Sequence, residues 1–243
     1  AEVVASAADE HPNVNFLITN TDPEAEMGDY ENLDHVETVL PDFVQTGALA
    51  GVVAGLMTQT KSIGFIGGMK LPSTTKKYAA YLASAQKIDA SITGQYNFEA
   101  GFTDASAGVK LTESWIGTDN VDVMWCDASA VDGGVRQALE NAGADSHFDI
   151  AQPIDIMGDS QPTVVTSTIT DWKIDQAMDE IVAGTFGGGK AITANMDNGG
   201  VSLGEFSSKI PEDIKSKIEE YAEQVKVGPF VTEDEVNAIK STL

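Results

Sequence analysis

The sequence predicts an α/β fold in which parallel sheets are flanked by helices. Short runs rich in β-branched and aromatic residues alternate with amphipathic stretches of helical periodicity through the middle of the chain. Strands separated by helices form right-handed βαβ units, which build a parallel sheet. The chain has 243 residues, 42% of them hydrophobic, and this is enough for a sizeable buried core.

The central segment shows the clearest elements. Ser62 to Gly67 has the composition of a buried strand, and a helix with apolar residues at i, i+3, i+4 and i+7 follows Pro72. Ser91 to Phe98 predicts the next strand, and Asp104 is a suitable N-cap for the helix after it. Val121 to Cys126 predicts a third strand. The remaining central elements are a helix carrying Val131, Val135, Ala138 and Leu139, and a strand beginning near Phe148.

Both flanks continue this alternation. On the N-terminal side we expect a helix (1–10), two strands (14–19 and 36–40) and a helix that carries Leu49, Val52, Val53 and Leu56 on one face. On the C-terminal side we expect a strand (163–168), a helix (171–183), a glycine turn (187–189) and two closing helices, the last at 233–241.

The charge balance excludes several classes of partner. The chain has 14 Lys and Arg residues and 38 Asp and Glu residues, which gives a net charge of −24. Phosphate backbones and anionic lipid surfaces are repelled by such a chain, so we expect neither nucleic acid nor a membrane surface as a partner. The acidity indicates a solvated surface that keeps the protein soluble, and a high-salt habitat is the alternative reading.

No apolar run approaches the roughly 18 residues that span a bilayer. The opening residues AEVVASAADE also lack the basic and apolar regions of a signal peptide. We therefore expect any export signal or lipid-anchoring cysteine to precede the residues given.

The residues that usually carry metal binding or catalysis are sparse. Cys126 is the single cysteine, and His11, His35 and His147 show no ligand spacing, so we expect neither a disulfide nor a metal site. The glycine-containing stretches 132–134 and 187–189 fit no phosphate-binding loop, and no Gly-x-Ser-x-Gly motif is present. We expect no enzymatic activity and no cofactor.

Several strings occur together in one order along nearly the whole chain. KSIGFIGGMKLP at Lys61 to Pro72 is the longest. The others include EHPNVNF (10–16), GFTDA (101–105), VDVMW (121–125), VVTST (164–168), DNGGV (197–201) and IPEDIKSKIEE (210–220). In content and order they resemble the basic membrane protein (BMP) family, the lipoprotein receptors of ABC importers, whose characterised members bind purine nucleosides.

The resemblance implies a two-lobed, type I periplasmic-binding-protein-like fold. Residues 1–60 and 163–188 would form lobe one, and 61–162 and 189–243 lobe two, with crossovers near Lys61, Pro162 and Gly187. Family members carry further residues before the counterpart of Ala1, so we expect lobe one to be incomplete. An incomplete lobe leaves open sheet edges, which makes a dimer or a partner chain an alternative to a simple fragment.

The function implied is that of an extracytoplasmic receptor. It would capture a small neutral molecule, a nucleoside, between its lobes and dock on a membrane ABC permease. A receptor of the same fold for a sugar or another small molecule is one alternative. A regulatory or structural protein that has lost its pocket is another, and a nucleoside hydrolase would need an aspartate cluster that the sequence does not show.

In open α/β sheets ligands bind beyond the carboxyl ends of the strands, which places the candidate residues just after them. By the resemblance, Trp125 stacks on a nucleobase, and its alternative is a core residue. Asp127 and Ser129 follow in the same loop, where Asp127 could instead cap a helix. Phe102 belongs to the GFTDA match.

Three further candidates rest on the resemblance alone. Asp159 aligns with an aspartate that accepts hydrogen bonds from ribose hydroxyls. Its alternatives are a turn-capping role and a one-residue shift in the alignment that favours Asp155. Gln45 and Thr170 stand where the family has an acidic residue and a lysine, so both departures remove charge from the pocket and weaken the purine assignment.

Overall fold

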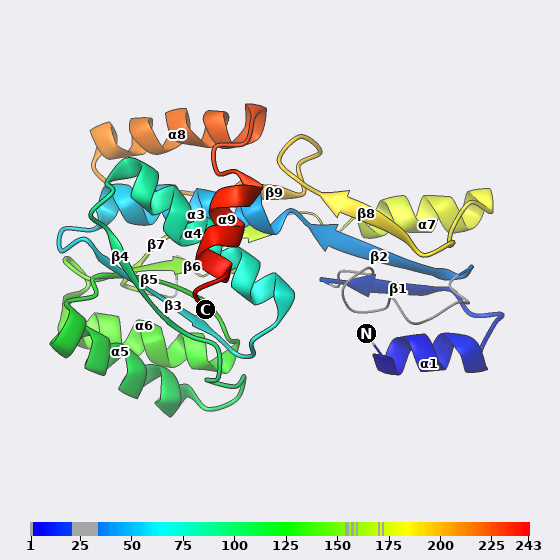
Figure 1. Ribbon diagram of the computed structural model, residues 1–243, viewed down its shortest axis with the longest axis horizontal. Coiled ribbons are helices and arrows are strands. Elements are labelled where there is room, and N and C mark those ends of the chain that lie inside the picture. Colours follow the sequence, from blue (N-terminus) through cyan, green and yellow to red (C-terminus); the bar gives the residue numbers. More distant parts are fainter. Residues whose placement is uncertain are drawn as a thin grey trace. The chain divides into compact units, whose positions relative to one another are not determined.

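The computed structural model describes residues 2–20, 34–153, 156, 158, 160–169, 171 and 173–243. Contacts divide the chain into two compact units, which are described separately. Unit 1 comprises Ala1–Asp42 and Ile169–Val201, and unit 2 comprises Phe43–Thr168 and Ser202–Leu243. The α/β prediction is confirmed, because parallel strands and helices alternate through most of the chain (Figure 1).

Unit 2 is built on a six-stranded sheet in the order β4-β3-β5-β6-β7-β9. The strands are β3 (Ser62–Gly67), β4 (Thr93–Asn97), β5 (Val123–Asp127), β6 (Phe148–Ala151), β7 (Thr163–Ile169) and β9 (Val201–Leu203). Neighbours from β4 through to β7 pair in parallel. Every residue of β3 is buried, as expected for a central strand covered on both faces.

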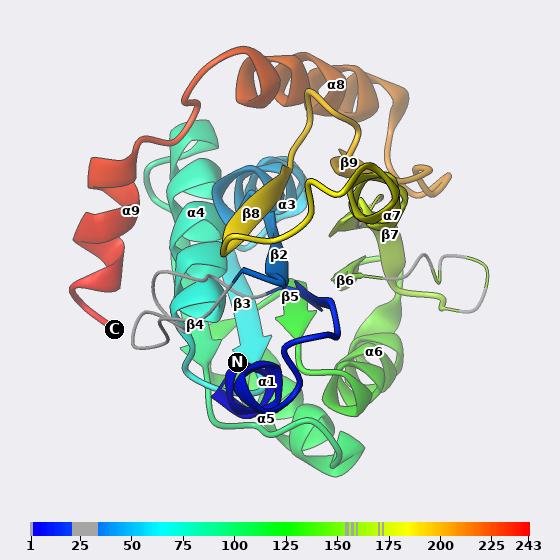
Figure 2. The same cartoon turned by 90° about the vertical axis from the view of Figure 1, so that its right-hand side faces the viewer.

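Helices cover both faces of this sheet (Figures 1 and 2). On one side lie α5 (Ala105–Asp119) and α6 (Ala130–Gly143). On the other lie α3 (Phe43–Met57) and α4 (Pro72–Ile88), with α8 (Glu212–Val227) and α9 (Glu233–Lys240) packed outside them. The expected N-cap of α5 is confirmed, since the Asp104 side chain accepts from the Ser106 amide.

The two faces of the unit 2 sheet carry different core residues, because neighbouring residues of a strand point to opposite faces. Met124 and Cys126 of β5 join the cluster beneath α5 and α6. Trp125 pairs in register with Phe65, and both rings pack with Tyr81 of α4 in an aromatic cluster. The α4 face of the core is therefore mainly aromatic, and the α6 face mainly aliphatic.

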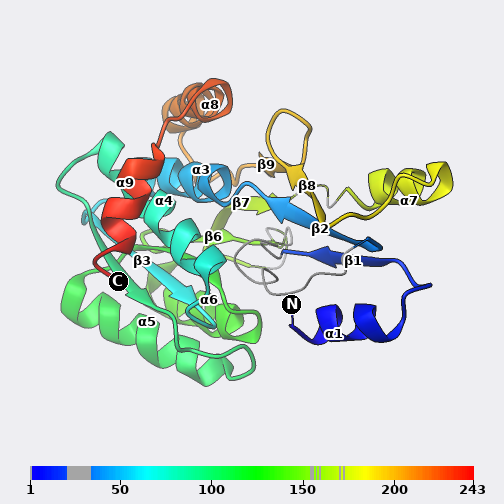
Figure 3. The same cartoon turned by 45° about the vertical axis from the view of Figure 1, so that its right-hand side comes forward.

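Unit 1 has a three-stranded parallel sheet in the order β1-β2-β8. Its elements are α1 (Glu2–Glu10), β1 (Phe16–Thr19), β2 (Val36–Pro41), α7 (Ile174–Ala183) and β8 (Lys190–Ala194). Ala5 and Ala8 of α1 pack on one face of the sheet, and Ala177 of α7 packs on the other (Figure 3).

The division into units differs from the expected lobe boundaries at three elements. The structure groups α3 with unit 2, where it packs against α4. Unit 2 also holds nearly all of β7, which pairs with β6, whereas β8 lies in unit 1 because it pairs with β2. The changes of unit therefore fall after Asp42, Thr168 and Val201 rather than near residues 60, 162 and 188. Among the described helices, none has both the length and the apolar character needed to cross a membrane.

Candidate functional site

The carboxyl ends of β3, β4 and β5 lie at one edge of the unit 2 sheet, and the loops that follow them are bonded together. The Gly68 amide donates to the Asp127 carbonyl at 3.1 Å, and the Gly101 amide donates to the Gly68 carbonyl at 3.0 Å. The Ala130 amide donates to the Phe102 carbonyl at 3.1 Å. This is the edge at which parallel α/β sheets bind their ligands.

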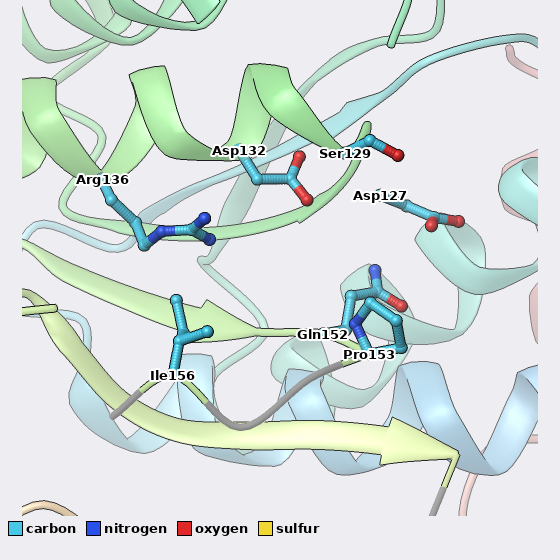
Figure 4. A pocket seen from close by; sticks show the side chains of 7 residues that line it. All are labelled: Asp127, Ser129, Asp132, Arg136, Gln152, Pro153 and Ile156. Atoms are coloured by element: carbon cyan, nitrogen blue, oxygen red, sulfur yellow. The ribbon is translucent and has the colours of Figure 1, made fainter. Parts of the chain in front are cut away.

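A pocket of about 430 Å³ opens at this edge, between the start of α6 and the segment after β6 (Figure 4). Its size lies within the range of small-molecule sites. The described residues that line it are Asp127, Ser129, Asp132, Arg136, Gln152, Pro153 and Ile156. Pro153 and Ile156 are apolar, and the other lining side chains carry hydrogen-bonding groups, although apolar atoms supply the larger part of the pocket surface. Two of the sequence-predicted residues, Asp127 and Ser129, lie in it.

Asp127 is fixed by a buried lysine that the sequence analysis missed. Lys77 of α4 is 2% exposed, and its Nζ lies 2.9 Å from Asp127 Oδ2. The same ammonium lies 3.5 Å from Gln152 Oε1 and 5.5 Å from the centre of the Phe43 ring. Gln152 is held in turn, because its Nε2 donates to the Cys126 carbonyl at 2.6 Å. A buried ammonium needs such partners to offset its lost hydration, so this set of contacts holds Asp127 in place.

Asp132 lies in the first turn of α6, and its side chain bonds back to the loop before the helix. Its Oδ1 accepts from the Ala128 amide at 2.9 Å. Ser129 occupies the N-cap position of α6 at φ 54°, but its side chain makes no capping hydrogen bond. Asp132 is 5% exposed, and burial raises the pKa of its carboxyl group to about 7, although the Ala128 amide and the Arg136 charge oppose the shift.

A second buried carboxyl group lies close to Arg136, the single arginine of the chain. Asp149 of β6 accepts from Thr163 Oγ1 at 2.7 Å, and burial raises the pKa of Asp149 to about 6. The Arg136 charge acts on both Asp132 and Asp149. Within the described ranges, Arg136 forms no ion pair, and its side chain lies in the pocket wall.

The other described candidates lie outside the pocket. Trp125 is 0% exposed, with its ring 5.3 Å from Phe65 and 5.4 Å from Tyr81, so the structure corrects the expected stacking position to a core position. Phe102 is 40% exposed, and its ring lies against Gly68 at the same sheet edge. Gln45 is half-buried in the first turn of α3.

Three remaining candidates cannot be placed. Asp155, Asp159 and Thr170 lie outside the described residues, so their roles stay predictions. In the part of the chain that is described, no three His, Cys, Asp or Glu side chains gather in a way that could hold a metal ion.

A family model described as ABC transporter substrate-binding protein PnrA-like matches residues 1–231. The chain is 27% identical over 198 residues to the CD4+ T-cell-stimulating antigen of Listeria innocua, covering 74% of this chain and 54% of that protein. It is 28% identical over 221 residues to the ABC transporter nucleoside-binding protein BmpA of Lactococcus lactis, covering 84% of this chain and 60% of the relative. The chain thus spans little more than half the length of these relatives.

Solved structures share the fold at lower identity. A solute-binding protein of an ABC transporter system from Aeropyrum pernix superposes with a TM-score of 0.71 at 18% identity, covering 99% of this chain and 71% of that one. A transcriptional activator of the comK gene from Bacillus halodurans superposes with a TM-score of 0.75 at 18% identity, covering 96% of this chain and 77% of that one. At this identity the likeness shows the periplasmic-binding-protein-like fold alone.

Proposed function

Because the chain belongs to the PnrA-like family of ABC transporter substrate-binding proteins, we propose that it is the solute receptor of an ABC importer. It captures a small neutral molecule, a nucleoside, outside the cytoplasmic membrane and presents it to a membrane permease. The receptor binds and releases its solute without chemical change.

The pocket at the carboxyl edge of the unit 2 sheet, with charged and polar side chains in its wall, is the observation that carries this proposal. Lys77 forms an ion pair with Asp127 at this pocket, and the Arg136 charge acts on the buried Asp132 and Asp149. A neutral solute leaves these interactions uncharged by any further group, whereas an anion or a cation would add an uncompensated charge. The Ser129 hydroxyl group, which makes no capping hydrogen bond, can both donate and accept, as the polar groups of a nucleoside require.

The choice of a nucleoside rests on the family relationship. The Lactococcus lactis relative is named as a nucleoside-binding protein, and it is 28% identical to this chain. The pocket volume of about 430 Å³ accommodates a molecule of this size or a large part of it. Phe102, half-exposed at the same edge, offers an aromatic face for a base in place of the buried Trp125.

Thermal unfolding with a panel of nucleosides, free bases and free sugars tests the proposal. A solute that binds only the native state raises the melting temperature, by an amount that grows with its concentration over Kd. We expect a rise with nucleosides that Asp127→Asn reduces, because the substitution removes the charge that Lys77 fixes.

The matched control is Asp145→Asn, which makes the same chemical change at a side chain that is 99% exposed. Its shift should equal that of the wild type. A rise in melting temperature with free sugars alone would identify the solute as a sugar and leave the receptor function standing. No rise with any member of the panel would contradict the receptor function.

A further inference from the structure

A buried ammonium group stands behind the pocket wall. Lys77 belongs to the buried stripe of α4 and is 2% exposed, and it is not among the described residues that line the pocket. Its Nζ lies 2.9 Å from Oδ2 of Asp127, whose side chain does line the pocket and is 28% exposed. Figure 4 shows Asp127 at the pocket wall on the same side as Gln152. A solute in the pocket can therefore meet Asp127, whereas Lys77 acts on the solute through Asp127.

Contacts from other elements fix the position of this ammonium group. It lies 3.5 Å from Gln152 Oε1 and 5.5 Å from the centre of the Phe43 ring, whose face attracts a cation. Gln152 turns its oxygen towards Lys77 because its Nε2 donates to the Cys126 carbonyl at 2.6 Å. The ammonium group would lose these contacts if it moved into the pocket, so the arrangement fixes its distance from Asp127.

The ion pair changes the charge that a solute meets at Asp127. A lone carboxylate in a partly buried wall attracts cations over several ångströms, because a low dielectric constant strengthens the interaction between charges. An opposite charge 2.9 Å away cancels most of this attraction at the distance of a solute, since the two charges then act as a dipole. The charge of Asp127 is therefore balanced only as long as Lys77 is present.

We propose that Lys77 determines the charge selectivity of the pocket. By balancing Asp127 from behind the wall, it makes the pocket select neutral solutes over cationic ones. Lys77 is a positioning residue, because it acts through Asp127 and does not itself line the pocket. This inference rests on the proposed receptor function and names the residue that sets its preference for an uncharged solute.

A purely structural role for Lys77 makes a different prediction. Loss of packing alone would weaken the binding of every solute by a similar factor, whatever the charge of the solute. Loss of charge balance would instead change the ratio of the affinities for a cationic and a neutral solute in the same protein. The charges of Asp132 and Arg136 are present in every variant compared, so they cancel in this ratio.

The experiment measures Kd by calorimetry at about pH 7 for adenosine, which is neutral, and for two cationic analogues. N1-methyladenosine carries its charge on the base and 5′-amino-5′-deoxyadenosine carries it on the sugar, so one of the charges lies near Asp127 in either orientation of the solute. The wild type should bind adenosine more tightly than both analogues. Lys77→Met, which removes the charge and keeps the length of the side chain, should shift the preference towards at least one of the cations by about 10-fold or more.

Two further variants locate the effect. Lys77→Met combined with Asp127→Asn removes both charges, so the preference should return to that of the wild type. Lys76→Met makes the same change one residue earlier on α4, where the ammonium group pairs with Glu233 at 3.2 Å on the surface, and it should leave the preference unchanged. Urea unfolding checks that each variant is folded. Lys77→Gln, which removes the charge and retains a donor for Asp127, supplies the same measurement if Lys77→Met does not fold.

The outcomes separate this inference from the receptor function. A preference that stays the same for both cations when the charge of Lys77 is removed would overturn the inference and leave the nucleoside receptor standing. A shift towards a cation that persists in the double variant would also overturn it, because the shift would not come from Asp127. No binding of adenosine to the wild type would contradict the nucleoside receptor and, with it, this inference.

Discussion

At the scale of single residues, the two buried carboxyl groups near Arg136 link the pocket to pH. Burial raises the pKa of Asp132 to about 7 and that of Asp149 to about 6, from an ordinary value of 3.8. The folded protein therefore retains protons that the unfolded chain releases above about pH 4. Each group contributes stability that is complete below the unfolded pKa and is lost as the pH rises through the folded pKa.

Asp132→Asn removes this pH-dependent term and retains the hydrogen bond from the Ala128 amide. We expect the variant to gain stability over the wild type as the pH rises from about 5 to about 8, by about 1–4 kcal/mol at the upper end. Urea unfolding of both proteins at these two pH values measures the gain. An equal difference in stability between the two proteins at both pH values would contradict the buried, proton-retaining state of Asp132.

The residues of the pocket were only partly predictable from the sequence. Asp127 and Ser129, chosen because they follow a strand, where parallel sheets place their sites, line the pocket, and their ligand-binding role stays a prediction. Trp125 follows the same rule in sequence, but its side chain points to the face that α4 covers, and no local pattern reveals which face is covered. Lys77 was missed although a signal existed, since its i, i+4 spacing to Tyr81 places it on the buried stripe of α4.

At the scale of elements, glycines set the distance between α3 and α4. A Cβ atom at Gly51 would collide with the Tyr81 carbonyl oxygen and lie 2.7 Å from Ser84 Cβ. A Cβ atom at Gly47 would lie 2.9 Å from Ala80 Cβ. The close approach permits the hydrogen bond from Ser84 Oγ to the Ala48 carbonyl at 2.7 Å. The two helices therefore pack backbone to backbone above the aromatic cluster.

Substitution of alanine at two helical glycines should act in opposite directions. Gly51→Ala forces α3 and α4 apart and should lower stability by about 1–3 kcal/mol. Gly117→Ala in α5 meets no atom within 4 Å and should raise stability by about 0.5–1 kcal/mol through helix propensity. Chemical unfolding of the two variants beside the wild type measures both. A neutral Gly51→Ala would contradict the close packing of these helices.

The elements themselves were largely predictable, and the exceptions have a common cause. β3 has the bounds that its composition predicts, and the helices after β3, β4 and β5 appear in order. β8 and β9 were not predicted, because they are short and stand beside glycine turns. β8 forms by pairing with β2, far away in sequence, and such pairing leaves little trace in local composition.

At the scale of the whole molecule, the division into units depends on packing partners rather than on chain order. The family resemblance placed α3 in lobe one, whereas its glycine-mediated contact with α4 groups it with unit 2. In unit 1, β1 and β8 are the edge strands of the sheet, so each is paired along one side only among the described residues. The dimer or partner chain expected from open edges stays a prediction, which sedimentation of the purified protein tests.

The net charge of −24 also acts on the molecule as a whole. Like charges spread over one compact surface repel each other, and unfolding relieves the repulsion by separating them. Salt screens exposed charges over about 10 Å at 0.1 M and about 3 Å at 1 M, while buried pairs such as Lys77–Asp127 are screened much less. Added NaCl should therefore stabilise the folded state.

We expect the melting temperature at about pH 7.5 to rise by several degrees between about 10 mM and 1 M NaCl, as about 1 kcal/mol of repulsion is removed. The control is the same titration close to the sequence pI of about 4.1, where the net charge is small. There the rise should nearly vanish, because little repulsion remains to be screened. A rise of equal size at both pH values would instead assign the salt effect to strengthened burial of apolar surface, which does not depend on the protein's charge.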